Sequence, residues 1–536
     1  MLSAVGISDR LDHARTLVYA AHEDAARDLL LSLLSAIEHE DRDDFALEVF
    51  AQLGEIYLIR GADSGVAECI RRITDCLESY RGIDGTPEIA YLIGRYTRRA
   101  EFLTTGLVAA RGDHDGAEAA LARLVAAGDT DDECAGEHRD LILHARIRCA
   151  VALADNELYS RALPLWHKAI ESLGQLGSDP AADRLYVLAA TEYGRYCVDT
   201  GRIAEAHPWL SRAGARAQAR GWELAQARTH LERAAASWVT GDHETTEVLV
   251  NQAYPVIARH ARVQDVSRCW LYLGLIRLAV GDLDGADVCW GHAERHWREL
   301  GAPLPMYRIL LQRSWIAIFR GEHDAALAMI ERARQYLETA PRHSWLQTAR
   351  LDNHLGTVWR AAALAGLGFD ASDPDDLGVI DEPAGTPRYQ QAMADLERAA
   401  DLKIPAALAI DSVRYSIADA AVRSQWANKV AAPLWAGAFA VAWEWENTEL
   451  ISQLIEYHSA RGMLSAPASE GGGEWASAAT GSVAIDAMDG PIELGPLPAL
   501  QMDPGGPAVL GRYRMLARQR YGTRVTSELP GWSTWL

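Results

Sequence analysis

The sequence predicts an all-α, right-handed solenoid of αα-hairpins that is closed by a C-terminal helical cap. Glycines stand at positions 201, 241, 281 and 321, a spacing of 40 residues, and each follows an apolar, helix-like run. A glycine that ends one helix, followed by a helix with small residues where it approaches its neighbour, is typical of stacked hairpins. Five, nine and twelve residues after each glycine, small, large and small side chains recur: Ala206, Leu210 and Ala213; Thr246, Val250 and Ala253; Ala286, Trp290 and Ala293; Ala326, Ile330 and Ala333.

Weaker copies of the same pattern precede residue 201. Their turns fall at Ala21, Gly61, Gly112 and Glu157, which makes eight hairpins, and Leu355 begins a ninth first helix that ends near residue 366. Seven residues before several turns a further small residue predicts close packing of the first helix of each pair: Gly54, Ala150, Gly194, Ala234, Gly274 and Ser314.

This combination of residues resembles the tetratricopeptide repeat (TPR) family over residues 11–366. Leu273-Gly274 with Gly281 and Ala286 carries the resemblance best. The chain departs from the family pattern in its longer period, in Thr246, and in having few prolines at repeat ends. The resemblance implies a concave groove that is lined by the first helices and binds a protein segment.

The C-terminal third changes composition several times. Residues 367–387 are rich in Asp, Gly and Pro and predict a loop or linker. Residues 388–464 predict a helical cap, with Pro405 and Pro433 marking the starts of helices. Residues 465–507 are rich in Gly, Ser, Ala and Pro and predict a disordered or extended strap. Residues 508–536 predict a short basic helix over 508–521, followed by a tryptophan-containing tail that docks on the fold.

Short motifs in this third carry a second resemblance. They are Arg414-Tyr415-Ser416, Ala432-Pro433 and, before Trp532, Arg520-Tyr521-Gly522. They look like the region that joins repeats to caspase-like CHAT protease domains in actinobacterial proteins, although no protease domain follows here. The resemblance implies a TPR component of a CHAT-associated bacterial conflict or signalling system, whose protease would be a separate partner.

Charge and cysteine content exclude several classes of function. Asp and Glu number 74 against 52 Lys and Arg, a net charge of −22, so we expect neither nucleic acid nor a membrane surface as partner. The seven cysteines include no C-x-x-C pair, which favours reduced thiols, and no apolar leader is visible at the N-terminus. We therefore expect a cytoplasmic protein.

Sequence motifs for catalysis or metal binding are not found. No phosphate loop of the G-x-x-x-x-G-K-[ST] kind and no H-E-x-x-H motif occur. His292 and His296 could share a helix face, but we expect them to pack or to be solvated. Cys197, Cys269 and Cys289 fall where the repeat needs small buried residues. We expect no catalytic residues, no metal and no cofactor.

An arginine ladder is the polar feature that most clearly indicates a binding surface. It consists of Arg228, Arg268 and Arg308, each thirteen residues before a turn glycine. In the family that the chain resembles this position faces the groove, and guanidinium groups bind carboxylates in a bidentate manner. The alternative is that each arginine pairs with an acid of the adjacent repeat. The apolar positions beside the ladder, which the chain's own tail could also fill, are Leu231, Trp238, Leu271, Leu278, Leu311, Trp315 and Ile318.

These observations predict a non-enzymatic scaffold or sensor that binds a protein or peptide in its groove. A CHAT protease is the partner that the second resemblance implies. The alternative is a peptide- or ligand-responsive TPR transcriptional regulator, against which the acidic charge and the lack of a helix-turn-helix segment argue. Trp426, Trp435, Trp443 and Trp445 are expected in the core of the cap, with a partner surface as the alternative.

Overall fold

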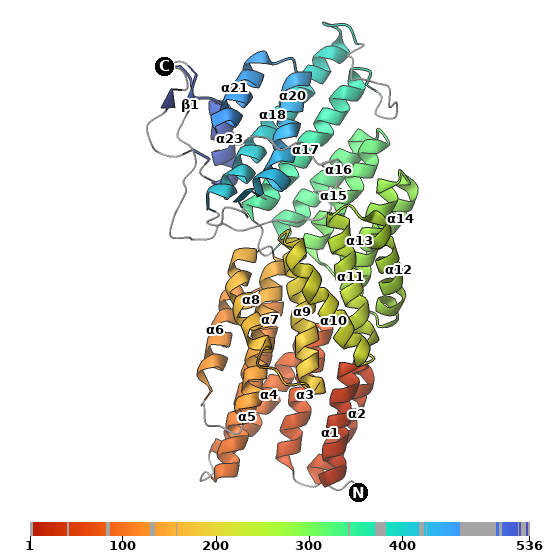
Figure 1. The fold of residues 1–536 in the computed structure, drawn as a ribbon, viewed down its shortest axis with the longest axis vertical. Coiled ribbons are helices and arrows are strands. Elements are labelled where there is room, and N and C mark those ends of the chain that lie inside the picture. The colour runs from red at the N-terminus through yellow and green to blue at the C-terminus, as the bar shows by residue number, and fades with distance from the viewer. Residues whose placement is uncertain are drawn as a thin grey trace. The chain divides into compact units, whose positions relative to one another are not determined.

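The computed structural model describes residues 4–39, 42–81, 86–128, 134–156, 158–340, 344–369, 382–416, 423–424, 426–460, 500–502, 506–523, 525–526 and 532–533. These residues form helices throughout, apart from one pair of two-residue strands (Figure 1). Contacts divide the chain into two compact units. Unit 1 comprises Met1–Ser237 and Val248–Arg262, and unit 2 comprises Trp238–Glu247 and Val263–Leu536.

Unit 1 is a row of antiparallel helix pairs. Each odd-numbered first helix packs against its own second helix, and α3, α5, α7 and α9 also contact one another in succession. Ten helices lie wholly in this unit: α1 (Ala4–Tyr19), α2 (Glu23–His39), α3 (Asp43–Arg60), α4 (Asp63–Arg81), α5 (Pro87–Ala110), α6 (His114–Ala126), α7 (Ala135–Asp155), α8 (Tyr159–Leu173), α9 (Pro180–Asp199) and α10 (Ile203–Ala219). The division between the units runs through α11 (Glu223–Val239) and α12 (His243–Arg259).

Unit 2 continues the same hairpins and adds the cap. Its helices pack in sequence, and α17 against α18 is an extensive pairing. The elements are α13 (Val263–Ala279), α14 (Leu283–Glu299), α15 (Pro303–Phe319), α16 (His323–Thr339), α17 (Trp345–Gly366), α18 (Pro387–Ser412), the 3-10 helix η1 (Val413–Ser416), the π-helix η2 (Ala427–Ala431), α20 (Ala432–Glu444), α21 (Thr448–Ala460), β1 (Leu500–Gln501), α23 (Gly511–Tyr521) and β2 (Trp532–Ser533).

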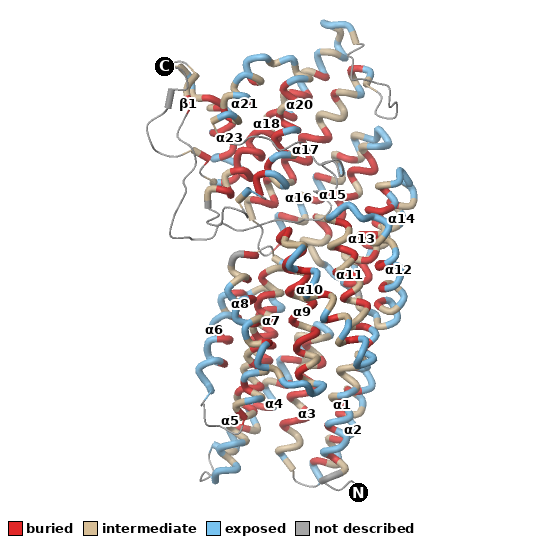
Figure 2. Tube along the Cα trace, in the orientation of Figure 1, coloured by how far each residue is buried: buried red, intermediate tan, exposed pale blue. Residues whose placement is uncertain are grey.

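The repeat predicted from the glycine spacing is confirmed as a packing unit. Gly201, Gly241, Gly281 and Gly321 end first helices with φ of 74°, 82°, 78° and 71°, the left-handed region that glycine adopts without strain. The small, large and small positions after them are buried, and Ala286, Trp290 and Ala293 are each 0% exposed. Buried residues recur along the helices in the same way (Figure 2). The chain is thus an all-α, TPR-like helical-repeat protein.

Close helix approach depends on the small residue in the middle of the first helix. A Cβ atom added to Gly274 would lie 2.2 Å from Nε1 of Trp290, the large residue on the paired helix α14. The indole N–H donates a hydrogen bond of 3.1 Å to the carbonyl oxygen of Leu271, which holds the ring in place. The glycine on one helix therefore makes room for the tryptophan on the other.

The prediction that a helix starts at Pro405 is wrong. Helix α18 runs without a break from Pro387 to Ser412 and contains Pro405. A proline inside a helix leaves the carbonyl four residues earlier without its N–H donor, here that of Asp401. Arg520 of α23 donates to this oxygen at 2.5 Å, so the C-terminal helix supplies the missing hydrogen bond. Pro433, by contrast, lies in the first turn of α20, as expected.

The remaining C-terminal segments show where the tail lies. The predicted strap falls largely outside the described residues, and the basic helix starts at Gly511 instead of residue 508. Arg512 of this helix pairs with Asp401 of α18 at 2.6 Å. Trp532 of β2 is the parallel partner of Leu500 in β1, so two stretches of the C-terminal segment pair with each other.

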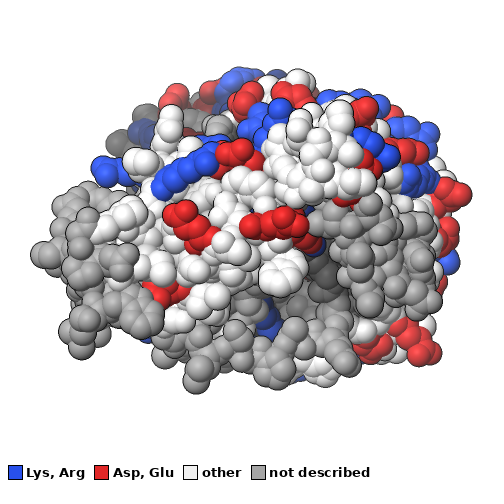
Figure 3. Space-filling model, turned by 90° about the horizontal axis from the view of Figure 1, so that it is seen from above, with Lys and Arg blue, Asp and Glu red and all other residues white. Residues whose placement is uncertain are grey.

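Of the four cap tryptophans, two belong to the core. Trp426 and Trp435 are 0% and 2% exposed, Trp445 is half-buried, and Trp443 is 75% exposed. None of the described helices is long and apolar enough to cross a membrane. In the face shown in Figure 3, charged side chains of both signs lie along the upper edge, and a few acidic side chains interrupt the uncharged surface below it.

Candidate functional site: the face of the first helices

The three ladder arginines lie on first helices, at intermediate burial. Arg228 is on α11 in unit 1, and Arg268 and Arg308 are on α13 and α15 in unit 2. Each takes part in at least one polar, ring or electrostatic contact. Arg228 is close enough to Glu192 of α9 to oppose the rise in that carboxyl's pKa, whose main cause is burial. A contact with a neighbouring acid of this kind is what the alternative reading of the ladder expects.

The apolar residues predicted beside the ladder divide by burial. Leu271 and Ile318 are half-buried, whereas the other five are at most 7% exposed: Leu231, Trp238, Leu278, Leu311 and Trp315. These five side chains contribute to packing in this conformation. Their role in binding a partner stays a prediction.

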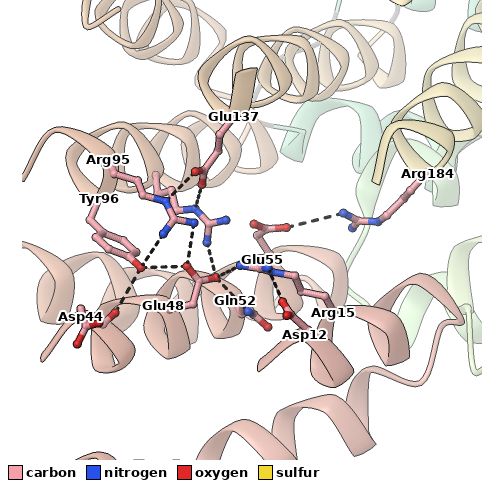
Figure 4. A network of polar contacts seen from close by, with 11 residues as sticks. Asp12, Arg15, Asp44, Glu48, Gln52, Glu55, Arg95, Tyr96, Glu137 and Arg184 are labelled. Carbon is pink, nitrogen blue, oxygen red and sulfur yellow. Dashed lines mark hydrogen bonds and ion pairs between the residues drawn. The ribbon is translucent and has the colours of Figure 1, made fainter. Parts of the chain in front are cut away.

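The positions thirteen residues before two other turn glycines belong to a buried ion network in unit 1 (Figure 4). Thirteen residues before Gly61 and Gly112 stand Glu48 of α3 and Arg99 of α5, and Arg99 Nη1 donates to Glu48 Oε1 at 3.0 Å. Side chains at this count on adjacent first helices therefore can meet. Sequence reasoning missed this pair because the positions hold an acid and a base instead of two arginines.

The network joins four first helices through two carboxylates. Glu48 accepts from Arg15 of α1 at 2.6 Å, and its other oxygen lies 3.4 Å from Arg95 Nη2. Arg95 and Arg99 are one turn apart on α5, so both also reach Glu137 of α7, at 2.7 and 2.6 Å. The bridging helix is therefore held on both sides by charge-assisted hydrogen bonds.

Electrostatics keep the central carboxylate ionised. Burial alone would raise the pKa of Glu48, but the guanidinium groups of Arg99, Arg15 and Arg95 outweigh burial and hold that pKa well below its usual range. The Tyr96 hydroxyl lies 3.0 Å from the same carboxylate, and burial raises the pKa of this phenol. The network therefore links the first helices through charged hydrogen bonds.

A cavity of about 520 Å³ opens beside this network between α1, α3 and α5. Its walls include Leu11, Phe45 and Leu92, and its charged residues are two arginines and four carboxylates: Arg15, Arg95, Asp12, Asp44, Glu48 and Glu88. The cavity therefore has an excess of negative charge. It disfavours an acidic ligand.

Arg148 of α7 differs from every arginine of the network. It makes no hydrogen bond and no ion pair with any residue that the structure describes, and its Nε is buried. Burial, with repulsion from Arg184, lowers the pKa of Arg148 to about 10, so it remains charged at neutral pH. Glu55 and Glu192 oppose this shift from a distance. A guanidinium that loses water without gaining a partner is unfavourable, and such groups are candidates for a binding site.

A polar position in the repeat could have indicated Arg148. It stands nine residues before the turn at Glu157, and the same count before Gly61, Gly201 and Gly241 gives Gln52, Glu192 and Glu232. All lie on first helices. A polar residue that recurs at one position of otherwise apolar first helices indicates the face of these helices that points inward. The arginine ladder was found thirteen residues before the turns, so it did not include this position.

Unit 1 closes on itself through contacts between its first and last hairpins. Arg184 of α9 lies 3.8 Å from Glu55 of α3 (Figure 4) and over the ring of Tyr19. Glu23, at the start of α2, pairs with Arg262, and it is 3% exposed. The face that carries Arg148 is thus partly enclosed by side chains of distant repeats.

The histidines considered in the sequence analysis contact a tryptophan ring, and two of the cysteines are fully buried. The rings of His292 and His296 lie 5.2 and 6.2 Å from that of Trp270. Cys197 and Cys269 are 0% exposed, and burial raises the pKa of Cys197 to about 12. No group of three or more His, Cys, Asp or Glu among the described residues could hold a metal ion.

Comparisons with known proteins find structures of low sequence identity to this chain. No protein-family model and no curated protein matches the chain. A Rap protein complexed with Competence and Sporulation Factor is similar at a TM-score of 0.43 and 10% identity, over 75% of this chain and 99% of that chain. The Rap conjugation gene regulator of plasmid pLS20, in complex with the Phr* peptide, is similar at 0.36 and 11%, over 77% and 98%. BtubC (BKLC) from P. vanneervenii is similar at 0.32 and 18%, over 43% and 94%. At these TM-scores the likeness carries no argument about function.

Proposed function

We propose that this chain is a non-enzymatic scaffold or sensor that binds a carboxylate-bearing protein segment against its first helices. The observation that carries the proposal is Arg148, a half-buried guanidinium that makes no hydrogen bond or ion pair with the described residues. A carboxylate of a partner would give it the bidentate pairing that the fold does not. In unit 2, Arg268 and Arg308 of the predicted ladder would bind further carboxylates of the partner in the same way.

Charge decides which part of unit 1 would receive the acidic group. The cavity between α1, α3 and α5 has four carboxylates and two arginines, so it repels an acid. Around Arg148 the balance differs, because the two arginines there, Arg148 and Arg184, face two carboxylates, Glu55 and Glu192, so negative charge is not in excess. The acidic residue of the segment would therefore sit at α7, while the apolar walls of the cavity suit a neighbouring side chain.

A peptide-display selection on the full-length chain tests this proposal. Selected peptides should be enriched in Asp and Glu, and the Arg148→Met variant should lose that enrichment while keeping its thermal stability. The matched control is Arg123→Met, an exposed arginine of α6 that already pairs with Glu101 at 3.2 Å. If Arg148→Met loses stability and still selects the same peptides, Arg148 serves the fold and the proposal is wrong.

The ladder is tested separately by Arg268→Glu together with Arg308→Glu. We expect this double variant to abolish partner capture without lowering the melting temperature. A large loss of stability with intact capture would establish the alternative, in which these arginines pair within the chain. A caspase-like CHAT protease, the partner class implied by the C-terminal motifs, is the first protein to mix with the chain in these assays.

A further inference from the structure

A second charged site lies in unit 2, and its lining includes none of the arginines proposed to bind the protein segment. It is a surface pocket of about 370 Å³ on α14, and Arg313 of α15 completes its wall. Arg295, Arg298 and His292 line it together with two carboxylates, Asp287 and Glu294. Gly291 leaves its floor open, since a Cβ there would have no atom within 4 Å.

The carboxylates hold several guanidinium groups in fixed positions. Glu294 is 2% exposed and accepts from Arg298, from Arg313 and, at 3.0 Å, from Arg332 of α16. Asp287 accepts from Nη2 of Arg313 at 2.7 Å. Side chains that are already ordered lose little entropy when an anion arrives, so this arrangement favours binding.

Arg295 brings positive charge that no carboxylate of the described residues pairs with. It is exposed, and its one hydrogen bond to the described residues runs from Nη2 to Nδ1 of His292, at 2.7 Å. Because a guanidinium can only donate, Nδ1 of His292 accepts and the ring proton lies on Nε2. The ring packs on Trp270, so a second donor is held at the same pocket.

The charge count favours a doubly charged anion. Three arginines line the pocket against the two carboxylates Asp287 and Glu294, and Arg332, outside the lining, also pairs with Glu294, so arginines exceed carboxylates by two on a chain whose net charge is −22. We propose that this pocket binds a phosphate group, with Arg295 and Arg298 supplying the free N–H donors. Guanidinium forks match the geometry of phosphate oxygens. Free phosphate and a phosphorylated side chain of another protein share this chemistry.

Titration with inorganic phosphate at constant ionic strength tests the site on the full-length chain. We expect saturable binding with a dissociation constant of about 1 mM or tighter, and binding of acetate, a single charge, at least about ten times weaker. The Arg295→Gln/Arg298→Gln variant should weaken phosphate binding about tenfold or more. The control is Arg123→Gln/Arg259→Gln, two surface arginines that each pair with a glutamate, at 3.2 and 3.1 Å.

A second variant distinguishes a loss of phosphate binding from a loss of folding. In Glu294→Gln the arginines lose their internal counter-charge, so the variant should melt lower, bind phosphate more tightly and be stabilised by phosphate more than the parent chain. Equal phosphate affinity in the parent and the double-glutamine variant, or no saturable binding, would overturn the proposal. A phosphoserine peptide that binds far more tightly than free phosphate would identify a phosphorylated protein as the source; equal affinities would identify a small phosphate.

Discussion

Replacing Gly274 with alanine tests the packing rule on which the repeat depends. The new Cβ would lie 2.2 and 2.5 Å from Nε1 and Cδ1 of Trp290, a rigid ring that is 0% exposed. Overpacking of this kind is unfavourable by about 1–3 kcal/mol. Displacing the ring would also weaken its hydrogen bond to Leu271, by about 1 kcal/mol. Alanine offsets about 1 kcal/mol of this loss, because its helix propensity is higher than that of glycine.

The net expectation is a loss of about 1–3 kcal/mol in the free energy of unfolding. For a domain of this size that corresponds to a fall of roughly 2–10 °C in the melting temperature, measured by circular dichroism at the helix band. Gly291→Ala is the matched control, because it lies on the paired helix and its Cβ would meet open space. This control should be as stable as the parent chain or more so. If Gly274→Ala behaves like Gly291→Ala, the close approach of the two helices is not what selects glycine.

Three further predictions concern unit 1. Glu48→Gln should lower stability by about 3 kcal/mol at pH 7. Folding lowers the pKa of this carboxyl, so its contribution is present above the unfolded value of about 4.3 and is lost as pH falls below it. The gap in unfolding free energy between parent and variant should therefore shrink in acid; a gap that is constant with pH would refute the assignment. Cys197, buried and with its pKa raised to about 12, should resist alkylation at pH 8 in the native chain and react after denaturation; rapid native labelling, read by mass spectrometry, would contradict this. Glu23→Gln should weaken the pairing with Arg262 and speed amide hydrogen exchange near His22, whereas unchanged exchange would show that this contact does not hold the first hairpin.

Much of the fold could be predicted because the residues that pack between helices recur at fixed intervals along the chain. The glycines at turns need a left-handed backbone, and the alanines and large residues after them alternate with the geometry of two helices in contact. Pro405 could not be placed in this way. Whether a proline starts a helix or lies inside it depends on whether another group satisfies the freed carbonyl, and here Arg520 donates to that of Asp401 from 119 residues away.

The candidate site was predicted less well than the fold. The sequence alone determined which residues fall on the first helices, because that follows from the 40-residue count, and it determined that the chain is acidic and arginine-rich. Only the tertiary structure decided which charges meet. Glu48 is neutralised by three arginines from two other helices, whereas Arg148, in an equally regular position, has no such partner among the described residues. Pairing depends on distances between side chains of different repeats, and those distances are set by how the helices pack and curve, which no count along the chain contains.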